Sequence, residues 1–352
     1  MKRTALAVLC MSAIVCSGIR CVNVQAEESN VKVTREIQAS IDMGLRYLAS
    51  QQRPDGSYLG SSGDLTGPVA AATLAYMAVG NLSNEGPYAH QVSRGVTYLL
   101  NSAQPDGIIL KNRKGHGTMY NHGLATLCLA EAWGMTRDPR IIDKLEKAIE
   151  LQVRAQGPRG SWTYEPEPRD GDMSITIMQV LALRAAYDAG VAVPKETIDR
   201  AVRYINSCQC KPDAQGLVGY GYSGASGPKF STTAAAVMSL QVCGDYRPKS
   251  LKPGLDYLMS GRQAGRDNEW FLYGHYYAVQ AMFQASRHPG FQKYWDFWYP
   301  SITKTLMSQQ VKTGANRGEF KVQHARVPGV MQTAWSILIL AVPYNYLPIY
   351  QK

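Results

Sequence analysis

The sequence lacks the features of several protein classes. No uninterrupted apolar run reaches the roughly 18 residues that a membrane-spanning helix needs, and the apolar stretch 5–19 ends at Arg20. No sustained period-two alternation indicates strands. Lys and Arg outnumber Asp and Glu by 37 to 27, for a net charge of +10, but the basic residues are scattered and form no stripe. We therefore expect no transmembrane segment, no sheet and no nucleic-acid partner.

Cysteine is also scarce, and four of its seven residues follow residue 26: Cys128, Cys208, Cys210 and Cys243. The Cys-x-Cys pair among them has no second pair to complete a zinc site, so we expect buried free thiols. His116 and His122 are six residues apart rather than three or four, and no carboxylate stands at ligand spacing beside them. The sequence predicts neither a metal nor another cofactor.

The first residues resemble an export signal rather than part of a fold. Lys2 and Arg3 precede the apolar stretch 5–19, and Val24-Gln25-Ala26 offers small residues at the spacing of a cleavage site. We predict a signal peptide over 1–26 and export to the periplasm or the exterior of a bacterium. Its removal takes away Lys2, Arg3 and Arg20, which lowers the net charge from +10 to +7, and leaves 27–352 as one domain.

Beyond this leader, one sequence pattern recurs six times. Each copy places apolar residues at i, i+4, i+6 and i+7 with charges between them, which is the stripe of an amphipathic helix buried on one side. The copies begin near residues 41, 92, 145, 198, 251 and 299, a spacing of 48 to 53 residues. A period this steady indicates repeated supersecondary units.

A turn and a second kind of helix follow each copy. The turns combine Gln with Pro-Asp-Gly or Gly-Ser-aromatic, residues that end helices and accept positive φ. The helices that follow are small-residue-rich and almost uncharged, as in helices buried on all sides. They are expected over 70–77, 174–186, 231–238, 276–283 and 332–340. Because the last helix has no polar cap of the kind an open array needs, we predict an all-α, closed (α/α)6 toroid.

The turn Gln-x(3–5)-Gly-Ser-aromatic resembles the glutamine–tryptophan repeat of the terpenoid cyclase and protein prenyltransferase superfamily, whose members share an α/α toroid. The stretches 276–284 and 341–351 look like those of exported bacterial prenyltransferase and squalene oxidase repeat proteins. The resemblance covers the chain after residue 26. It implies the toroid fold and an apolar central cavity that binds or acts on an isoprenoid or another apolar small molecule.

Two departures from that family concern its chemistry. Alignment on 181–183 places the Asp-x-Asp-Asp-Thr acid motif of the cyclases on 172–176, where the proton-donor position is Ser174. A neutral hydroxyl cannot supply the strong acid that alkene protonation needs. No Asp-x-Cys precedes the fifth inner helix, so the prenyltransferase zinc site is missing as well. If the chain is an enzyme, the resemblance implies a prenyltransferase-like or cyclase-like transferase or isomerase.

The candidate site lies where the inner helices begin, because in a closed ring these six N-termini surround one mouth and favour anions. His275 beside Tyr276 suits proton transfer. Asp172 and His122 are further catalytic candidates. Asp172 has an alternative interpretation as a helix cap, and the two histidines as hydrogen-bonded core residues. The candidates for substrate binding are Asp170, His116, Tyr220, Tyr222, His324 and Arg326.

Three functions stay open at this point. An isoprenoid site predicts aromatic and leucine side chains down the bore, with cations at one rim. An exported polysaccharide-active enzyme predicts an open cleft with several acids and exposed rings, and a glycosidase needs two carboxyl groups about 5–9.5 Å apart. A non-catalytic binding or scaffold toroid predicts a bore plugged by large side chains. The sequence names neither a substrate nor an oligomeric state.

Overall fold

The computed structural model describes residues 32–58, 65–111, 117–245, 247–262, 264–265, 270–322 and 327–351. Within these residues the chain forms α-helices, two short 3-10 helices and isolated β-bridges but no strand, as the sequence predicts. The helices are α1 (Arg35–Gln51), α2 (Thr66–Met77), α3 (Ala89–Ser102), α4 (Thr118–Thr136), α5 (Ile142–Arg154), α6 (Met173–Asp188), α7 (Lys195–Ser207), α8 (Phe230–Val242), α9 (Pro248–Met259), α10 (Phe271–Ser286), α11 (Gln292–Ser308), α12 (Gly329–Ala341), η1 (Val342–Tyr344) and η2 (Pro348–Tyr350).

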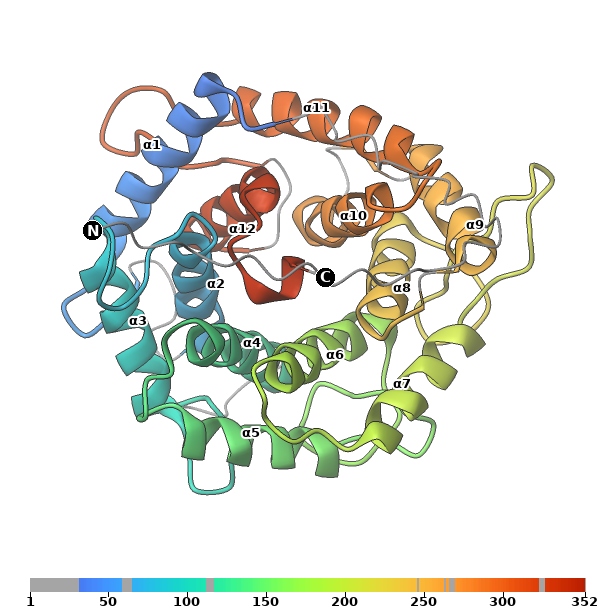
Figure 1. The fold of residues 1–352 in the computed structure, drawn as a ribbon, viewed down its shortest axis with the longest axis horizontal. Helices are drawn as coiled ribbons and strands as arrows, with labels where there is room; N and C mark the ends of the chain where they lie inside the picture. Colours follow the sequence, from blue (N-terminus) through green and yellow to red (C-terminus); the bar gives the residue numbers. More distant parts are fainter. Residues whose placement is uncertain are drawn as a thin grey trace, which may run out of the picture.

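The α-helices form two concentric rings, with odd-numbered helices outside and even-numbered helices inside (Figure 1). Each inner helix packs against the next, and α12 packs against α2 and α1, so the ring is closed. The burial of each helix follows its composition. α7 buries one stripe that includes Ala201 and Tyr204, whereas every residue of α8 is buried. The predicted closed (α/α)6 toroid is confirmed.

The repeated glutamine of the turns joins neighbouring repeats. Gln156 Nε2 donates to the carbonyl oxygen of Thr197 at the start of α7, at 2.9 Å. The last repeat uses the same contact to close the ring. Gln310 Nε2 donates to the Ser40 carbonyl oxygen in α1 at 2.8 Å, and Ser40 Oγ donates to Gln310 Oε1 at 2.7 Å. These two side chains therefore fix their turns to the outer helix that follows.

The glycine of the same turns allows close contact with that helix. Gly160 and Gly318 have φ values of +96° and +99°, a region that favours glycine. A Cβ atom on Gly318 would lie 2.1 Å from the Met43 carbonyl oxygen of α1, and one on Gly160 would lie 2.2 Å from the Arg200 carbonyl oxygen of α7. Any other residue would push the outer helices apart, so the motif acts as a packing device.

One position of the inner helices, which we call the anchor position, binds the preceding turn. In three repeats it is a threonine whose Oγ1 accepts the backbone N–H of the buried turn aromatic: Thr176 from Trp162 (3.3 Å), Thr233 from Tyr220 (2.9 Å) and Thr333 from Phe320 (3.0 Å). His122 occupies the anchor position of α4, and His275 occupies that of α10. The anchor residue holds the turn against the start of its inner helix.

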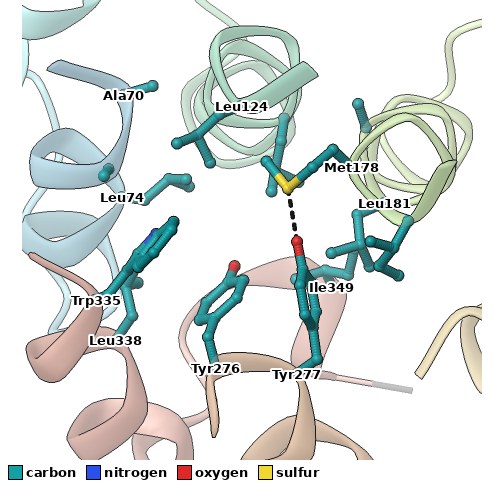
Figure 2. Packing of buried hydrophobic residues seen from close by; sticks show 14 of the residues in the cluster. Ala70, Leu74, Leu124, Met178, Leu181, Tyr276, Tyr277, Trp335, Leu338 and Ile349 are labelled. Carbon is teal, nitrogen blue, oxygen red and sulfur yellow. Dashed lines mark hydrogen bonds between the residues drawn. The ribbon is translucent and has the colours of Figure 1, made fainter. Parts of the chain in front are cut away.

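The bore of the inner ring is packed with side chains rather than empty. Leu74, Leu124, Tyr276 and Trp335 converge on its centre (Figure 2), and all four are buried. Beside them, Tyr277, Met178 and Leu181 meet Ile349 of the C-terminal segment, and the Tyr277 hydroxyl donates to Met178 Sδ at 2.6 Å (Figure 2). The described C-terminal segment ends near the middle of the ring (Figure 1), and its η2 packs against α4 and α6. This part of the bore is therefore filled.

The sixth outer helix begins earlier than the repeat pattern indicates. The pattern starts near residue 299, but α11 begins at Gln292. Its first turns carry Tyr294 and Trp295, which are buried, and the Tyr294 hydroxyl donates to Asp256 Oδ1 of α9 at 2.7 Å. These contacts come from aromatic rings rather than from the aliphatic residues of the other repeats. The repeat pattern therefore does not mark the first turns of α11.

Three further predictions concern the leader, the cysteines and membrane-spanning segments. The predicted signal peptide 1–26 lies outside the described residues. The four cysteines of the described part are free, and Cys243 is only partly buried. No helix among the described residues is long and apolar enough to cross a membrane.

Candidate functional site

Two adjoining cavities lie where the inner helices begin, and we call them together the mouth cleft. The apolar cavity has a volume of about 320 Å³, and its walls include Leu65, Pro68, Leu124, Met178, Leu272, Met331 and Trp335. The polar cavity has a volume of about 210 Å³, and its walls are Tyr120, Tyr164, Ser174, Tyr222, Lys229, Ser231, Thr232, Trp270 and Tyr273. The rings of Tyr120, Trp270 and Tyr273 border both. The mouth expected at the six helix N-termini is therefore present.

Asp172 lies at the centre of a hydrogen-bond network beside the polar cavity. Its Oδ1 accepts the backbone N–H of Ser174 at 2.8 Å and of Ile175 at 3.2 Å, which makes it the N-cap of α6. The same oxygen accepts the Ser174 hydroxyl at 2.5 Å, and Oδ2 accepts the Tyr222 hydroxyl at 2.7 Å. The carboxylate is therefore the acceptor in all four contacts.

Tyrosine hydroxyls extend this network along the cavity wall. Tyr120 donates to Ser174 Oγ at 2.5 Å, and Tyr273 donates to the Ser174 carbonyl oxygen at 3.1 Å. The hydroxyls of Tyr164 and Tyr222 are 2.6 Å apart. Because the Tyr222 proton already points to the carboxylate, Tyr164 is the donor of that pair. Two relays of hydroxyl groups thus end on the same acid and hold the cavity wall in one conformation.

The electrostatics of the network keep its phenols neutral. Burial, and then the hydrogen bonds to Tyr164 and Asp172, raise the pKa of Tyr222 well above its ordinary value. Burial also raises the pKa of Tyr120 and Tyr273. These hydroxyls therefore donate and accept hydrogen bonds at physiological pH and do not act as anionic nucleophiles or bases.

The rim of the polar cavity presents aromatic rings and one cation. Trp270 is 43 % exposed and Tyr222 is 39 % exposed, although large aromatic side chains are mostly buried elsewhere in the described chain. Lys229 supplies the basic side chain of the described walls. Exposed rings beside a fixed set of hydroxyls are typical of a binding site rather than of a packed core.

The structure brings two of the predicted site residues together, Asp172 and Tyr222. Asp170 is exposed outside the cleft, and its Oδ1 accepts the Arg159 backbone N–H at 2.7 Å in the preceding turn. Tyr220 is the buried aromatic residue of its turn and lines neither cavity. Tyr276 lies in the packed bore, where its ring stacks on Trp335 at a centroid distance of 6.3 Å (Figure 2).

The structure places both predicted histidines at anchor positions. His122 is buried, and its Nδ1 accepts the Ile109 backbone N–H at 3.2 Å. His275 Nε2 lies 3.0 Å from the Ala264 carbonyl oxygen. Burial lowers the pKa of His275 to about 4, so the ring is neutral and Nε2 is the donor. His275 borders a separate cavity of about 590 Å³ between α9, α10 and α11, away from Asp172.

The remaining predicted residues, His116, His324 and Arg326, lie outside the described residues. No group of three or more His, Cys, Asp or Glu side chains in the described ranges could hold a metal ion.

Sequence reasoning did not single out Tyr120, Tyr164, Trp270 and Tyr273. A signal for two of them exists in the repeat. Tyr120 and Tyr273 stand two residues before the anchor histidines, as Ser174 and Ser231 stand two residues before anchor threonines, and all four line the polar cavity. Alignment of the inner helices on the anchor position would therefore have indicated these cleft residues.

Comparison with known proteins by sequence finds a partial relative. No family model matches the chain. Over 143 residues it is 30 % identical to a lanosterol synthase of Aspergillus fumigatus, and the match covers 37 % of this chain and 18 % of that enzyme. The chain thus spans less than a fifth of the relative's length, and the match supports a weak similarity to the cyclases.

Comparison by structure finds toroids with other activities. An α-1,6-mannanase of a Salegentibacter species has a TM-score of 0.62 at 8 % identity, over 88 % of this chain and 99 % of that one. Cellobiose 2-epimerase of Spirochaeta thermophila has a TM-score of 0.60 at 12 % identity, over 88 % and 95 %. The fold is that of the (α/α)6 toroids. An inactive variant of the mannanase, with two consecutive aspartates replaced, is in complex with α-1,6-mannotriose.

Proposed function

We propose that the mouth cleft binds a saccharide and that the protein is an exported saccharide-binding (α/α)6 toroid. The observation that carries the proposal is the polar cavity, where oriented hydroxyls lie below the exposed rings of Trp270 and Tyr222. Sugars present C–H faces that pack on aromatic rings and hydroxyls that pair with groups such as Tyr164 and Lys229. The structural neighbours support this, since one of them is in complex with an α-1,6-mannotriose.

Binding is better supported than glycoside cleavage. A typical glycosidase places two carboxyl groups across the scissile bond, and the described walls of the two cavities contain no acidic side chain. Asp172, behind the wall, is occupied by four hydrogen bonds. The inactive mannanase variant lacks two consecutive aspartates, and this chain has no two adjacent acidic residues after residue 28.

An isoprenoid ligand is the second candidate, and the apolar cavity favours it. Leu124, Met178 and Trp335 would contact such a chain. The cyclase reaction lacks support at the site, however, because Ser174 stands at the proton-donor position and donates its hydrogen to Asp172. The bore is also filled beside Tyr277 and Ile349 (Figure 2), which limits the length of chain that it could hold.

The test is a titration of the mature chain with α-1,6-mannotriose, cellobiose and farnesol. Binding is measured by isothermal titration calorimetry and by tryptophan fluorescence. We expect saturable saccharide binding. Replacing Trp270 by Ala removes a stacking surface and should weaken it about tenfold, or about 1.4 kcal/mol. Tyr222→Phe should weaken it less, because the ring remains.

Tyr187→Ala is the matched control, since Tyr187 is 59 % exposed at the other end of α6. It should leave the affinity unchanged. Saturable binding of farnesol with no response to either sugar would replace the proposal by the isoprenoid one. Release of reducing ends from the mannotriose would show cleavage instead of binding alone. The proposed export is tested by N-terminal sequencing of the protein from the exported fraction, which should begin at Glu27.

A further inference from the structure

The mouth cleft is divided by side chains that face two ways. Tyr120 and Tyr273 both direct their hydroxyls to Ser174, at 2.5 Å to its Oγ and 3.1 Å to its carbonyl oxygen. Their rings border the apolar cavity as well as the polar one. The hydroxyl-bearing side and the apolar side of the cleft thus meet at one line of aromatic rings.

The side-chain amide of the apolar cavity is already paired within the protein. Asn121 Oδ1 accepts the Gly67 backbone N–H at 2.8 Å, and Asn121 Nδ2 donates to the Gly117 carbonyl oxygen at 2.9 Å. A Cβ atom on Gly67 would lie 2.8 Å from Asn121 Oδ1, so this contact is tight. The amide therefore fastens α2 to α4 and is not available to a ligand. The rest of the wall is mainly aliphatic and aromatic and includes Leu272, Met331 and Trp335. Its further polar atom is the buried Trp335 Nε1, which has no hydrogen-bond partner among the described residues.

We propose that the ligand of the mouth cleft is a glycoside with an apolar aglycone, whose sugar occupies the polar cavity and whose aliphatic or aromatic group enters the apolar cavity. This inference rests on the proposed saccharide function. Volumes of about 210 Å³ and 320 Å³ suit a single sugar ring beside a larger hydrocarbon group. The hydroxyl-bearing side chains of the walls are concentrated in the smaller cavity. A purely polar oligosaccharide would leave the apolar walls exposed to water.

The inference predicts how affinity depends on the length of the aglycone. The probes are methyl, butyl, hexyl and octyl α-D-mannopyranoside, each used below its micellar concentration, with 1-octanol as the sugar-free comparison. Each buried methylene contributes about 0.8 kcal/mol, which is roughly a fourfold gain in affinity. We expect affinity to rise along the series until the cavity is full, and 1-octanol to bind more weakly than the octyl glycoside.

Two variants separate the halves of the cleft. Met331→Trp fills the apolar cavity from α12, and Val327→Trp does so from the segment before that helix if the first variant does not fold. Both residues are half-buried. Either variant should abolish the gain with chain length, so that methyl and octyl mannoside bind it with the same affinity. Tyr222→Phe should weaken every glycoside by one common factor and leave the gain per methylene unchanged.

Met307→Trp, at a half-buried methionine of α11 outside both cavities, is the control and should retain the wild-type series. Equal affinity for methyl and octyl mannoside would overturn the apolar-aglycone inference and leave saccharide binding in place. Binding of 1-octanol as tight as that of the octyl glycoside, with no effect of Tyr222→Phe, would instead overturn saccharide binding itself.

Discussion

The two ends of the inner ring are built from the same six helices but are finished differently. At the mouth, the polar and apolar cavities remain between the helix starts, and Trp270 and Tyr222 are exposed. At the far end, the C-terminal segment packs against α4 and α6, and Leu347 and Ile349 are buried. Tyr346 of this segment covers Gly80, just after the end of α2. The contrast is between an end that is closed by side-chain packing and an end where two cavities remain.

Each end of the ring also holds a buried acid, Glu131 at the far end and Asp172 at the mouth, and their surroundings differ. Glu131 in the last turns of α4 is 1 % exposed, and burial raises the pKa of its carboxyl to about 8. The backbone of Ile349 opposes this effect, and Asp188 adds to it. Asp172 at the mouth is equally buried but has four donors around it. Glu131 is therefore mostly neutral at physiological pH, in keeping with its apolar surroundings.

The largest expected effect comes from this acid. The folded-state pKa of about 8 lies above the ordinary value of 4.5, so the folded state retains a proton that the unfolded chain releases. The contribution to stability is complete below about pH 4.5 and is lost as the pH rises to about 8. Glu131→Gln should remove this loss, which amounts to several kcal/mol on the scale of about 1.4 kcal/mol per pKa unit.

The measurement is urea unfolding of both proteins between pH 4.5 and pH 8.5. The difference between variant and wild type should grow in favour of the variant across this range. Glu146→Gln on the exposed face of α5 is the control and should follow the wild-type curve. A difference in the free energy of unfolding that stays constant at all pH values would mean that Glu131 is paired in the folded state. The two ends would then not differ in the electrostatic environment of their acids.

The second prediction concerns the hydrocarbon seal of the far end. Ile349→Ala removes a buried side chain beside Leu181 and Tyr277 (Figure 2) and should lower the free energy of unfolding by about 3 kcal/mol. Saccharide affinity at the mouth should not change when measured well below the midpoint of unfolding. Gln351→Ala, at an exposed residue of the same segment, should cost less than about 0.5 kcal/mol. A loss of affinity in the Ile349 variant would show that the two ends are coupled.

The third prediction concerns the mouth, where a stabilising contact and the binding site coincide. Asp172→Ala removes the cap of α6 and the acceptor of two hydroxyl relays, so it should cost about 2 kcal/mol and also weaken mannotriose binding. Thr34→Ala is a matched control, because Thr34 Oγ1 caps α1 through the Ile37 N–H at 3.3 Å. It should lower stability and leave binding unchanged. Equal affinities of the two variants for mannotriose would show that the Asp172 hydrogen-bond network does not contribute to ligand binding.

The fold could be predicted from the sequence because its devices are repeated. Gln156 and Gln310 make the same contact with the next outer helix, and Gly160 and Gly318 make the same close approach. Each copy therefore adds evidence for the same element. The mouth network is repeated only in part. Tyr164 and Tyr222 each stand two residues after a buried turn aromatic, whereas Asp172 has no acidic counterpart among the N-cap residues of the other inner helices. Whether a tyrosine hydroxyl turns to the cleft or to the core depends on contacts between repeats.

The histidines show a second limit of prediction from the sequence, because here residue type suggests a site where the structure has a packing contact. A histidine on an apolar helix face attracts attention because its chemistry is versatile, and residue type alone favours a catalytic interpretation. Only the register with Thr176, Thr233 and Thr333 shows that His122 and His275 stand where other repeats bind their turn. Sequence comparison between repeats therefore carries more information here than the residue type.

The smallest effect is expected at His122, and it tests the anchor position directly. His122→Thr retains an acceptor for the Ile109 N–H, whereas His122→Val has nearly the same shape as threonine and leaves that buried donor unpaired. The valine variant should be less stable than the threonine variant by about 1 kcal/mol in urea unfolding, and both should bind mannotriose like the wild type. If the two variants were equally stable but both failed to bind, His122 would belong to the ligand site rather than to the ring. The ligand site at the mouth would then extend past the cavity walls into the layer between inner and outer helices. The two ends of the ring would in that case differ in this layer as well as in the bore.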